Sequence, residues 1–137
     1  MITKPIPYGR QHITDEDIQC VIDALKSDYL TQGPKIKEFE EAFASYVGCK
    51  YAIAVNNATA GLHLAATALD VNLGDKVIVT PLTFAASANC IRFRGGEVVF
   101  CDVEEDTYLM DIKKLSRLLS QSPKGTYKGI VLVDFAG

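Results

Sequence analysis

Small and hydroxylated residues crowd the point where an apolar run gives way to a helical pattern. Residues 51–55 are apolar, and the sequence Asn57-Ala58-Thr59-Ala60 follows them at the start of the next expected helix. The first amides of a helix are unpaired and carry a partial positive charge. Small side chains would let a phosphate approach these amides, and the Thr59 hydroxyl could donate one more hydrogen bond. The pattern is typical of a phosphate site, but Thr59 acting as the N-cap of a core helix explains the same residues.

An aromatic residue follows the next apolar run of the chain. Phe84 lies four residues beyond the expected strand 76–80, among hydroxyl side chains that include Thr83 and Ser87. An aromatic ring at the carboxyl end of a strand could stack on the flat ring of a cofactor. The alternative is that Phe84 belongs to the hydrophobic core. The chain contains neither G-x-x-x-x-G-K-[ST] nor G-x-G-x-x-G, so the residues alone leave the ligand open.

Helical and extended patterns alternate along the chain and decide where these residues lie. Thr14 and Asp17 form a capping-box pattern at the start of one helix, and Gly48 marks the end of a second helix. The further expected helices are 59–69, 84–94 and 111–120, and the expected strands are 51–55, 76–80, 98–102 and 129–134. Apolar strands separated by helices indicate an α/β fold, in which a mostly parallel sheet is covered on both faces as a three-layer αβα arrangement. We divide 1–137 into N-terminal helices with a loop (1–50) and an αβ half (51–137).

Composition and charge exclude several classes of protein. The chain has 137 residues, of which 48% are hydrophobic, and a net charge of −3. This composition is globular and offers no basic surface for nucleic acid. No apolar run is long enough to cross a membrane and the N-terminus lacks the apolar core of a signal peptide, so we expect a cytoplasmic protein. The four cysteines lack metal-ligand spacing, which predicts reduced, mostly buried thiols and no metal site.

Several short motifs occur in a specific order and spacing. They are Pro7-Tyr8-Gly9-Arg10-Gln11, Leu30-Thr31-Gln32-Gly33-Pro34, Phe39-Glu40 with Tyr46-Val47-Gly48, Asn57-Ala58-Thr59-Ala60, Gly74-Asp75-Lys76-Val77-Ile78-Val79, Thr83-Phe84-Ala85-Ala86-Ser87-Ala88-Asn89 and Phe135-Ala136-Gly137. Together they resemble the N-terminal part of the DegT/DnrJ/EryC1/StrS sugar aminotransferases. Members of that family depend on pyridoxal 5'-phosphate (PLP) and have fold type I. Within the family, the motifs are most similar to the transaminases of the pseudaminic acid pathway, with a spore-coat polysaccharide enzyme as the alternative.

The resemblance implies a role for the residues at both strand ends. The turn that contains Ala58, Thr59 and Ala60 would bind the PLP phosphate, and Phe84 would stack on the pyridine ring. Substrate contacts would come from the N-terminal part of the chain, at Tyr8, Thr31 and Gln32. We expect His63 to serve packing, and Asn89 lies near the site in the family pattern. Asp134 departs from that pattern, which often has histidine at this position.

The resemblance also implies an activity. Such an enzyme transfers an amino group from glutamate to a UDP-4-keto-6-deoxy-hexose and works as a homodimer, without nucleic acid or membrane. We assign no catalytic residue here, because the family's Schiff-base lysine and its aspartate on the pyridine nitrogen are expected beyond Gly137. The chain alone is therefore expected not to transaminate, and its sheet is expected to be incomplete, with 51–55 unpaired. Two alternatives remain: a PLP-dependent sugar dehydratase of the same family, and a non-catalytic α/β fragment that at most binds phosphate or a partner.

Overall fold

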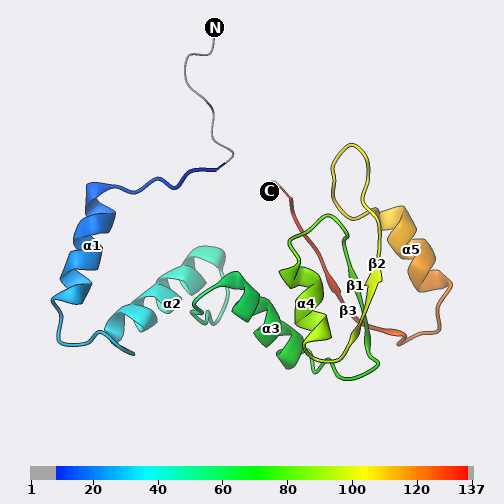
Figure 1. Ribbon diagram of the computed structural model, residues 1–137, viewed down its shortest axis with the longest axis horizontal. Helices are drawn as coiled ribbons and strands as arrows, with labels where there is room; N and C mark the ends of the chain where they lie inside the picture. The colour runs from blue at the N-terminus through cyan, green and yellow to red at the C-terminus, as the bar shows by residue number, and fades with distance from the viewer. Residues whose placement is uncertain (1–8, 136–137) are drawn as a thin grey trace, which may run out of the picture. The chain divides into compact units, whose positions relative to one another are not determined.

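The computed structural model describes residues 9–135, which divide between Ala54 and Val55 into an N-terminal unit and a C-terminal unit. Figure 1 shows the helices and strands of this part of the chain. The N-terminal unit contains α1 (Asp15–Leu25) and α2 (Pro34–Val47). The C-terminal unit contains, in order, α3 (Ala58–Ala68), β1 (Lys76–Val79), α4 (Ala86–Arg92), β2 (Glu97–Phe100), α5 (Ile112–Ser120) and β3 (Tyr127–Val131). Each unit is described by itself.

The start of α1 and the end of α2 lie where the sequence predicts them. Thr14 caps α1 by accepting a hydrogen bond from the backbone N–H of Asp17 at 3.2 Å. The Asp17 carboxylate accepts one in return from the Thr14 backbone N–H at 2.8 Å. These bonds stabilise the charged carboxylate, so the pKa of Asp17 lies below its ordinary value. Helix α2 ends at Gly48, whose φ of 71° lies in the left-handed region that favours glycine.

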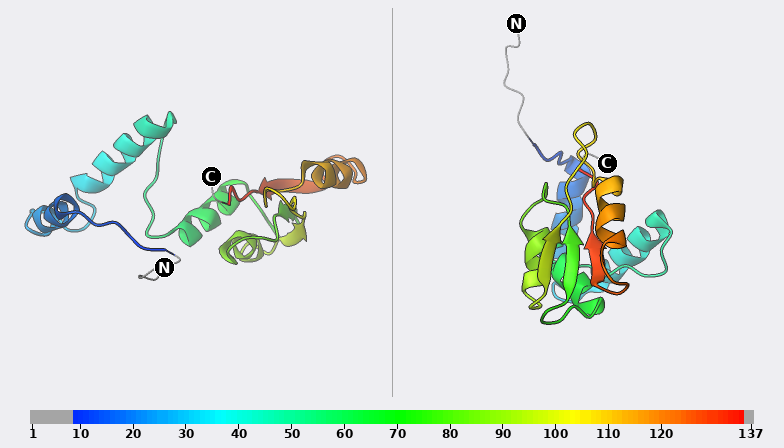
Figure 2. Two further views of the ribbon diagram at one scale, coloured as in Figure 1. Left: turned by 90° about the horizontal axis from the view of Figure 1, so that it is seen from above. Right: turned by 90° about the vertical axis from the view of Figure 1, so that its right-hand side faces the viewer.

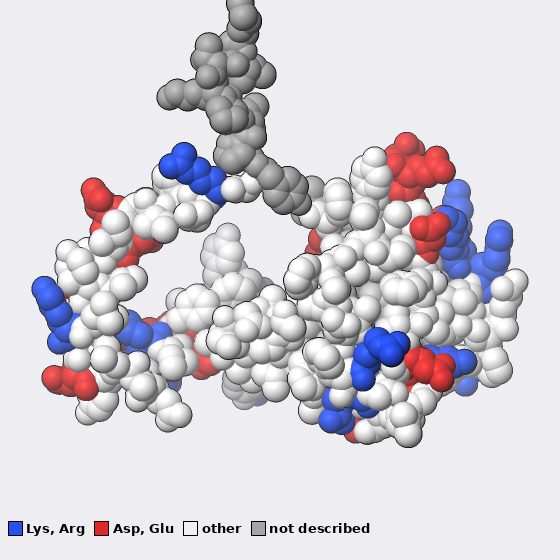
Figure 3. Space-filling view, viewed as in Figure 1, with Lys and Arg blue, Asp and Glu red and all other residues white. Residues whose placement is uncertain are grey.

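The apolar faces of the N-terminal helices are largely uncovered. Helix α1 buries no residue, and α2 buries only Ala44. The Phe39 and Phe43 rings of α2 contact each other with centroids 5.9 Å apart, and both remain exposed. The expectation of mostly buried thiols is wrong for this unit, because Cys20 is exposed. On the face shown in Figure 3, basic and acidic side chains are interspersed over the described residues of each unit.

A parallel sheet organises the C-terminal unit. Its strand order is β2-β1-β3, and β1 pairs in parallel with both neighbours. In the central strand, Val77, Ile78 and Val79 are fully buried. Val77 and Val79 pack with residues of α3 and α4, whereas Ile78 packs on the opposite face towards α5. Figure 2 shows α4 and α5 on opposite sides of the sheet. The predicted three-layer α/β fold with a parallel sheet is therefore confirmed.

Helices α3 and α4 run side by side in the same direction. The ring of His63, in the middle of α3, meets the ring of Phe93, at the end of α4, with centroids 5.8 Å apart. Beyond both helices, the Arg94 Nε donates a hydrogen bond to the Val71 carbonyl at 3.1 Å. Because their carboxyl-terminal ends lie together, the amino-terminal ends of α3 and α4 also lie at one end of the unit.

Several predicted element boundaries are wrong. Residues 51–55 form no strand, because none of the strands in the described part of the chain pairs with them. A hydrogen bond joins this segment to α2, since the Ala54 N–H donates to the Glu40 carboxylate at 2.8 Å. Strand β3 begins earlier and ends earlier than predicted, because pairing with the short β1 decides its length. Helix α4 begins at Ala86 rather than at Phe84, which leaves the Phe84 ring outside the helix.

Candidate functional site

The amino-terminal end of α3 has a cap and two free amides. The Asn57 side chain accepts a hydrogen bond from the Ala60 N–H at 2.9 Å, and the Asn57 carbonyl accepts one from the Gly61 N–H at 3.2 Å. The N–H groups of Ala58 and Thr59 have no partner among residues 9–135. Two unpaired amides at the positive end of a helix can bind an anion.

Thr59 is the second residue of α3 and does not cap it. The interpretation of Thr59 as an N-cap is wrong, because Asn57 occupies that position with extended backbone angles. The Thr59 side chain is exposed, and its hydroxyl makes no hydrogen bond within the described part of the chain. Its neighbours Ala58 and Ala60 have side chains too small to block an approaching group. The hydroxyl is therefore available beside the two free amides.

Sequence reasoning missed Asn57 as the residue that organises this turn. Its side chain satisfies the third amide of α3, and this leaves the first two free. The signal was present in the sequence, because asparagine directly before a helical run is a strong N-cap. Because the Thr59 hydroxyl could also cap a helix, the prediction placed the N-cap two residues too far along the chain.

Phe84 lies in the turn that follows the central strand. Its ring is 78% exposed, so the alternative that Phe84 is a core residue is wrong. The Phe84 carbonyl accepts a hydrogen bond from the Ser87 N–H at 3.0 Å, which ties the residue to the first turn of α4. An exposed ring of this size, on a tied backbone, can cover the face of a flat ligand.

The fold brings the α3 terminus and Phe84 to the same edge of the C-terminal unit. Phe84 follows β1, so it lies at the carboxyl edge of the parallel sheet and at the amino-terminal end of α4. The parallel course of α3 and α4 places Ala58 and Thr59 at that end as well. Ligands of open parallel sheets bind outside the carboxyl ends of the strands. An anion site and an aromatic ring at this edge could hold a flat molecule that carries a phosphate.

The residues that were predicted to contact a substrate lie elsewhere in the sequence. Thr31 and Gln32 belong to the N-terminal unit, in the loop between α1 and α2, and both are exposed. Gln32 has a φ of 51°, an uncommon conformation for a residue other than glycine. Tyr8 lies outside the described residues. The substrate role of these three residues stays a prediction.

Two further residues that the sequence singled out lie on α3 and α4. His63 packs against Phe93 at an interplanar angle of 60°, which confirms the packing role predicted for it. Asn89 lies on α4 with an exposed side chain, and its expected place near the site stays a prediction.

The carboxyl end of β2 carries an ion pair. Lys114 lies 2.8 Å from Asp102 and 3.9 Å from Asp111. The hydrogen bond from Lys114 lowers the pKa of Asp102, and the same bond raises the pKa of Lys114. Burial raises the pKa of the neighbouring Cys101 thiol. These groups therefore keep their ordinary charge states at neutral pH, and none of them is poised to exchange a proton there.

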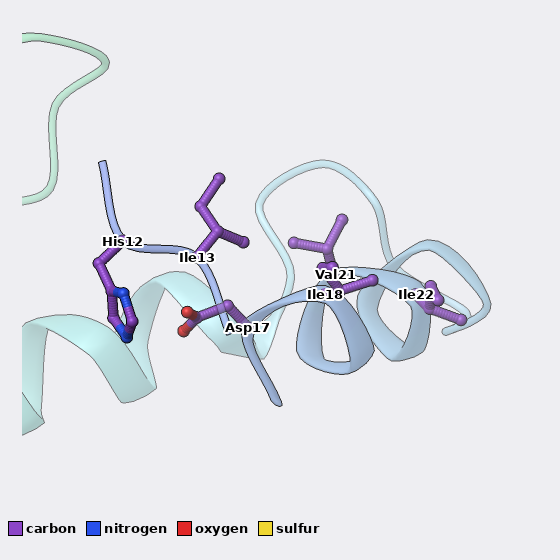
Figure 4. Close-up of a pocket in the computed structure, with 6 residues that line it drawn as sticks. All are labelled: His12, Ile13, Asp17, Ile18, Val21 and Ile22. Carbon is purple, nitrogen blue, oxygen red and sulfur yellow. The ribbon is translucent and has the colours of Figure 1, made fainter. Parts of the chain in front are cut away.

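A separate hollow lies along α1 in the N-terminal unit. It has a volume of about 520 Å³ and is lined by side chains of α1 and of the segment before it, among them Ile13, Ile18 and Val21. Figure 4 shows these three apolar side chains with His12 and Asp17. The hollow follows the uncovered apolar face of one helix, and its Asp17 carboxylate is already bonded to Thr14, so we do not regard it as a ligand site. Residues 9–135 contain no cluster of side chains that could hold a metal ion, and the helices among them are too short or too polar to cross a membrane.

Comparison with known proteins adds an independent line of evidence. A profile of the DegT/DnrJ/EryC1/StrS aminotransferase family matches residues 11–137. Over 96% of its length the chain is 44% identical to a UDP-4-amino-4,6-dideoxy-N-acetyl-β-L-altrosamine transaminase of Campylobacter jejuni, of which it covers 34%. It is 42% identical, also over 96% of its length, to the spore coat polysaccharide biosynthesis protein SpsC of Bacillus subtilis, of which it covers 33%.

A solved structure shows the same fold. The PMP form of Spr1654 from Streptococcus pneumoniae matches 96% of this chain with a TM-score of 0.84 and 35% identity, and the match covers 32% of that protein. The same protein is also known in a PLP form. The chain therefore spans about a third of the length of the curated relatives and of this structure.

Proposed function

Because the chain belongs to the DegT/DnrJ/EryC1/StrS aminotransferase family, we propose that it is the N-terminal part of a PLP-dependent nucleotide-sugar aminotransferase. The observation that carries this proposal is the carboxyl edge of the C-terminal unit. There, two amides and a hydroxyl at the start of α3, all without a partner among residues 9–135, lie at the same end of the unit as the exposed Phe84. The whole enzyme would be longer than this chain, because the chain covers only about a third of the length of its relatives.

The residues at this edge fit the cofactor. The PLP phosphate is an anion, and the amides of Ala58 and Thr59 offer two donors at a helix N-terminus, with the Thr59 hydroxyl as a third. Ala60 already donates to Asn57, so we assign it a steric role, in which its small side chain leaves room for the phosphate. The pyridine ring is flat and apolar on its faces, and Phe84 presents an exposed ring at the same edge.

The residues of this chain would bind and orient the cofactor. When bound, PLP supplies an electron sink that allows an amino group to move between an amino acid and a ketone. The amides and the hydroxyl at the start of α3 would hold the phosphate and fix the position of the ring. Phe84 would cover one face of the ring and keep water from it. Tyr8, Thr31 and Gln32 would orient the sugar substrate.

The substrate is proposed from the relatives. We propose a UDP-4-keto-6-deoxy-hexose as the amino acceptor and glutamate as the donor, in a cytoplasmic homodimer. The identity of 44% to a transaminase that acts on a UDP-linked amino sugar supports this substrate class. The identity of 42% to a spore coat polysaccharide biosynthesis protein supports a role in making a surface polysaccharide. The two identities are nearly equal, so we propose the class of substrate and leave the individual sugar open.

The phosphate assignment can be tested on the chain itself with a cofactor analogue. 4'-Deoxypyridoxine 5'-phosphate lacks the aldehyde of PLP and so cannot react with surface lysines. We expect Thr59→Val to weaken its binding by roughly tenfold, as the loss of a hydrogen bond to a charged group predicts. Thr67→Val is the matched control, since Thr67 lies in the same helix and its hydroxyl donates to the His63 carbonyl.

Phosphate-free 4'-deoxypyridoxine completes this experiment. Its binding should be weak and unaffected by Thr59→Val, because the Thr59 hydroxyl serves only the phosphate. If Thr59→Val weakens the binding of both analogues equally, the start of α3 does not bind the phosphate. The same conclusion follows if Thr59→Val and Thr67→Val have equal effects.

The activity is tested by an assay with glutamate and a UDP-4-keto-6-deoxy-hexose. We expect the chain alone to bind the analogue but not to form the amino sugar. The full enzyme that contains this sequence should release 2-oxoglutarate and the amino sugar in equal amounts. Formation of a deoxygenated sugar instead would indicate the dehydratase alternative. If the full-length protein that contains this sequence binds the analogue but shows no turnover, a non-catalytic phosphate-binding module is favoured.

A further inference from the structure

Two hydroxyl groups flank Phe84 and bond to each other. The Thr83 hydroxyl donates to the Ser87 hydroxyl at 2.7 Å, between positions four residues apart in the sequence. Ser87 is only 7% exposed, and Thr83 is half-buried. A short hydrogen bond in such a shielded place holds its partners more firmly than the same bond in open water. Phe84 lies within the short loop of chain that this bond closes.

The start of α4 has no side-chain cap, and the hydroxyl bond joins the residues on either side of it. Its N-cap position is Ala85, whose methyl group cannot accept a hydrogen bond. The first turn is closed by the backbone instead, through the Ser87 N–H to the Phe84 carbonyl at 3.0 Å and the Ala88 N–H to the Ala85 carbonyl at 3.2 Å. Both of these bonds span three residues, which tightens the turn around Phe84.

Phe84 itself has little else to hold its ring. The ring is 78% exposed, so packing against the core does not fix its position. Its backbone, by contrast, is fixed on both sides by the hydroxyl pair and by the Ser87 N–H. A ring on a fixed backbone loses less freedom when it stacks on a ligand, and binding is tighter for that reason.

We propose that Thr83 and Ser87 are positioning residues, whose hydroxyl-to-hydroxyl bond holds the Phe84 ring in place to stack on the cofactor. This inference rests on the proposed function, in which Phe84 covers the pyridine ring. Neither hydroxyl touches the cofactor in this proposal. They act only through the backbone of Phe84, so their contribution disappears when the Phe84 ring is removed.

A double-mutant cycle tests this proposal, with the affinity for 4'-deoxypyridoxine 5'-phosphate as the readout. The variants are Thr83→Val, Ser87→Ala and Phe84→Ala, with each hydroxyl variant also made in the Phe84→Ala background. We expect Thr83→Val and Ser87→Ala each to weaken binding by about threefold to tenfold, as the loss of one hydrogen bond predicts. In the Phe84→Ala background the same changes should have no effect. Thr83→Ser keeps the hydroxyl and should bind as the unaltered chain does.

The cycle separates the possible failures. If Phe84→Ala binds the analogue as tightly as the unaltered chain, the stacking role in the proposed function is wrong. If Phe84→Ala weakens binding but the hydroxyl variants weaken it equally with and without the ring, the pair supports the fold in general and the positioning role is overturned. Urea unfolding of each variant shows whether it folds. Ser87→Ala is the mildest change, since it removes one buried oxygen, and it keeps the test possible if Thr83→Val unfolds the chain.

Discussion

Replacement of Gly96 by alanine should destabilise the C-terminal unit, because Gly96 lies where α3, α4 and the sheet meet. A Cβ at this position would lie 2.8 Å from Ile91 Cγ2, 2.8 Å from Val71 Cγ1 and 3.1 Å from the Asp75 carbonyl oxygen. Ile91 and Val71 are 1% and 0% exposed, so neither side chain has space to rotate away. The Asp75 carbonyl is also fixed, because it accepts a hydrogen bond from the Glu97 N–H at 2.8 Å.

The magnitude follows from the cost of overpacking a core. One extra methyl group in a well-packed interior costs about 1–3 kcal/mol in the free energy of unfolding. Gly129→Ala is the matched control, because the Cβ there would meet Leu69 Cδ2 at 2.6 Å. Leu69 is 44% exposed and can rotate into solvent, so we expect this change to cost less than about 1 kcal/mol.

Urea unfolding followed by circular dichroism measures both variants of this pair. The expected order is that Gly96→Ala unfolds at clearly lower urea concentration than Gly129→Ala, with unchanged slopes of the two transitions. A Gly96→Ala variant as stable as the unaltered chain would refute the close packing of Ile91 in α4 against Val71, which follows α3. That packing is what brings the amino-terminal ends of both helices to the same edge.

Three further predictions concern the core, the capping box and the thiols. Ile78→Ala should lower the free energy of unfolding by about 2–5 kcal/mol in urea, because Ile78 is fully buried in the central strand; a smaller loss would contradict its place in the core. The bonds from Thr14 lower the pKa of Asp17, so their stabilisation of α1 is present at neutral pH and is lost as the pH falls through that lowered pKa. An NMR titration should find the pKa of Asp17 higher in Thr14→Val, and identical titrations would contradict the capping box. Iodoacetamide should modify the exposed Cys20 before Cys90, because burial raises the pKa of the Cys90 thiol. Mass spectrometry of the partly alkylated chain measures the order, and earlier modification of Cys90 would contradict its burial.

Local signals in the sequence were sufficient to predict several features of the fold. The Thr14–Asp17 capping box and the left-handed Gly48 depend on neighbouring residues only, and both are found as predicted. The parallel order of the sheet also followed, because Val77, Ile78 and Val79 form an apolar run without alternation. Such a run requires helices on both faces of the sheet, and the structure has them.

Features that depend on distant partners could not be predicted from local pattern. The residues 51–55 have the composition of a buried strand, but a strand also needs a neighbour to bond with, and the described part of the chain supplies none. The resemblance to longer enzymes anticipated this unpaired segment, whereas the apolar pattern alone did not.

The candidate site was predicted by resemblance and refined by geometry. The sequence placed Thr59 and Phe84 near two strand ends, but it could not show that α3 and α4 run in the same direction. It also misplaced the N-cap by two residues, because Asn57 and Thr59 are both good capping residues and only the backbone decides between them. The bond between Thr83 and Ser87 could not be predicted from the sequence, since it depends on the conformation of the turn that precedes α4.

The most direct test of the central claim is an NMR titration of the backbone amides with 4'-deoxypyridoxine 5'-phosphate. The claim is that the start of α3 binds the phosphate of the cofactor. The amides of Ala58 and Thr59 should then show the largest shifts of all the residues, with smaller shifts around Phe84 from the ring. Inorganic phosphate should move the first two amides and leave Phe84 unchanged. If the analogue binds while Ala58 and Thr59 stay unmoved, the phosphate lies elsewhere and the assignment of this edge as the cofactor site is wrong.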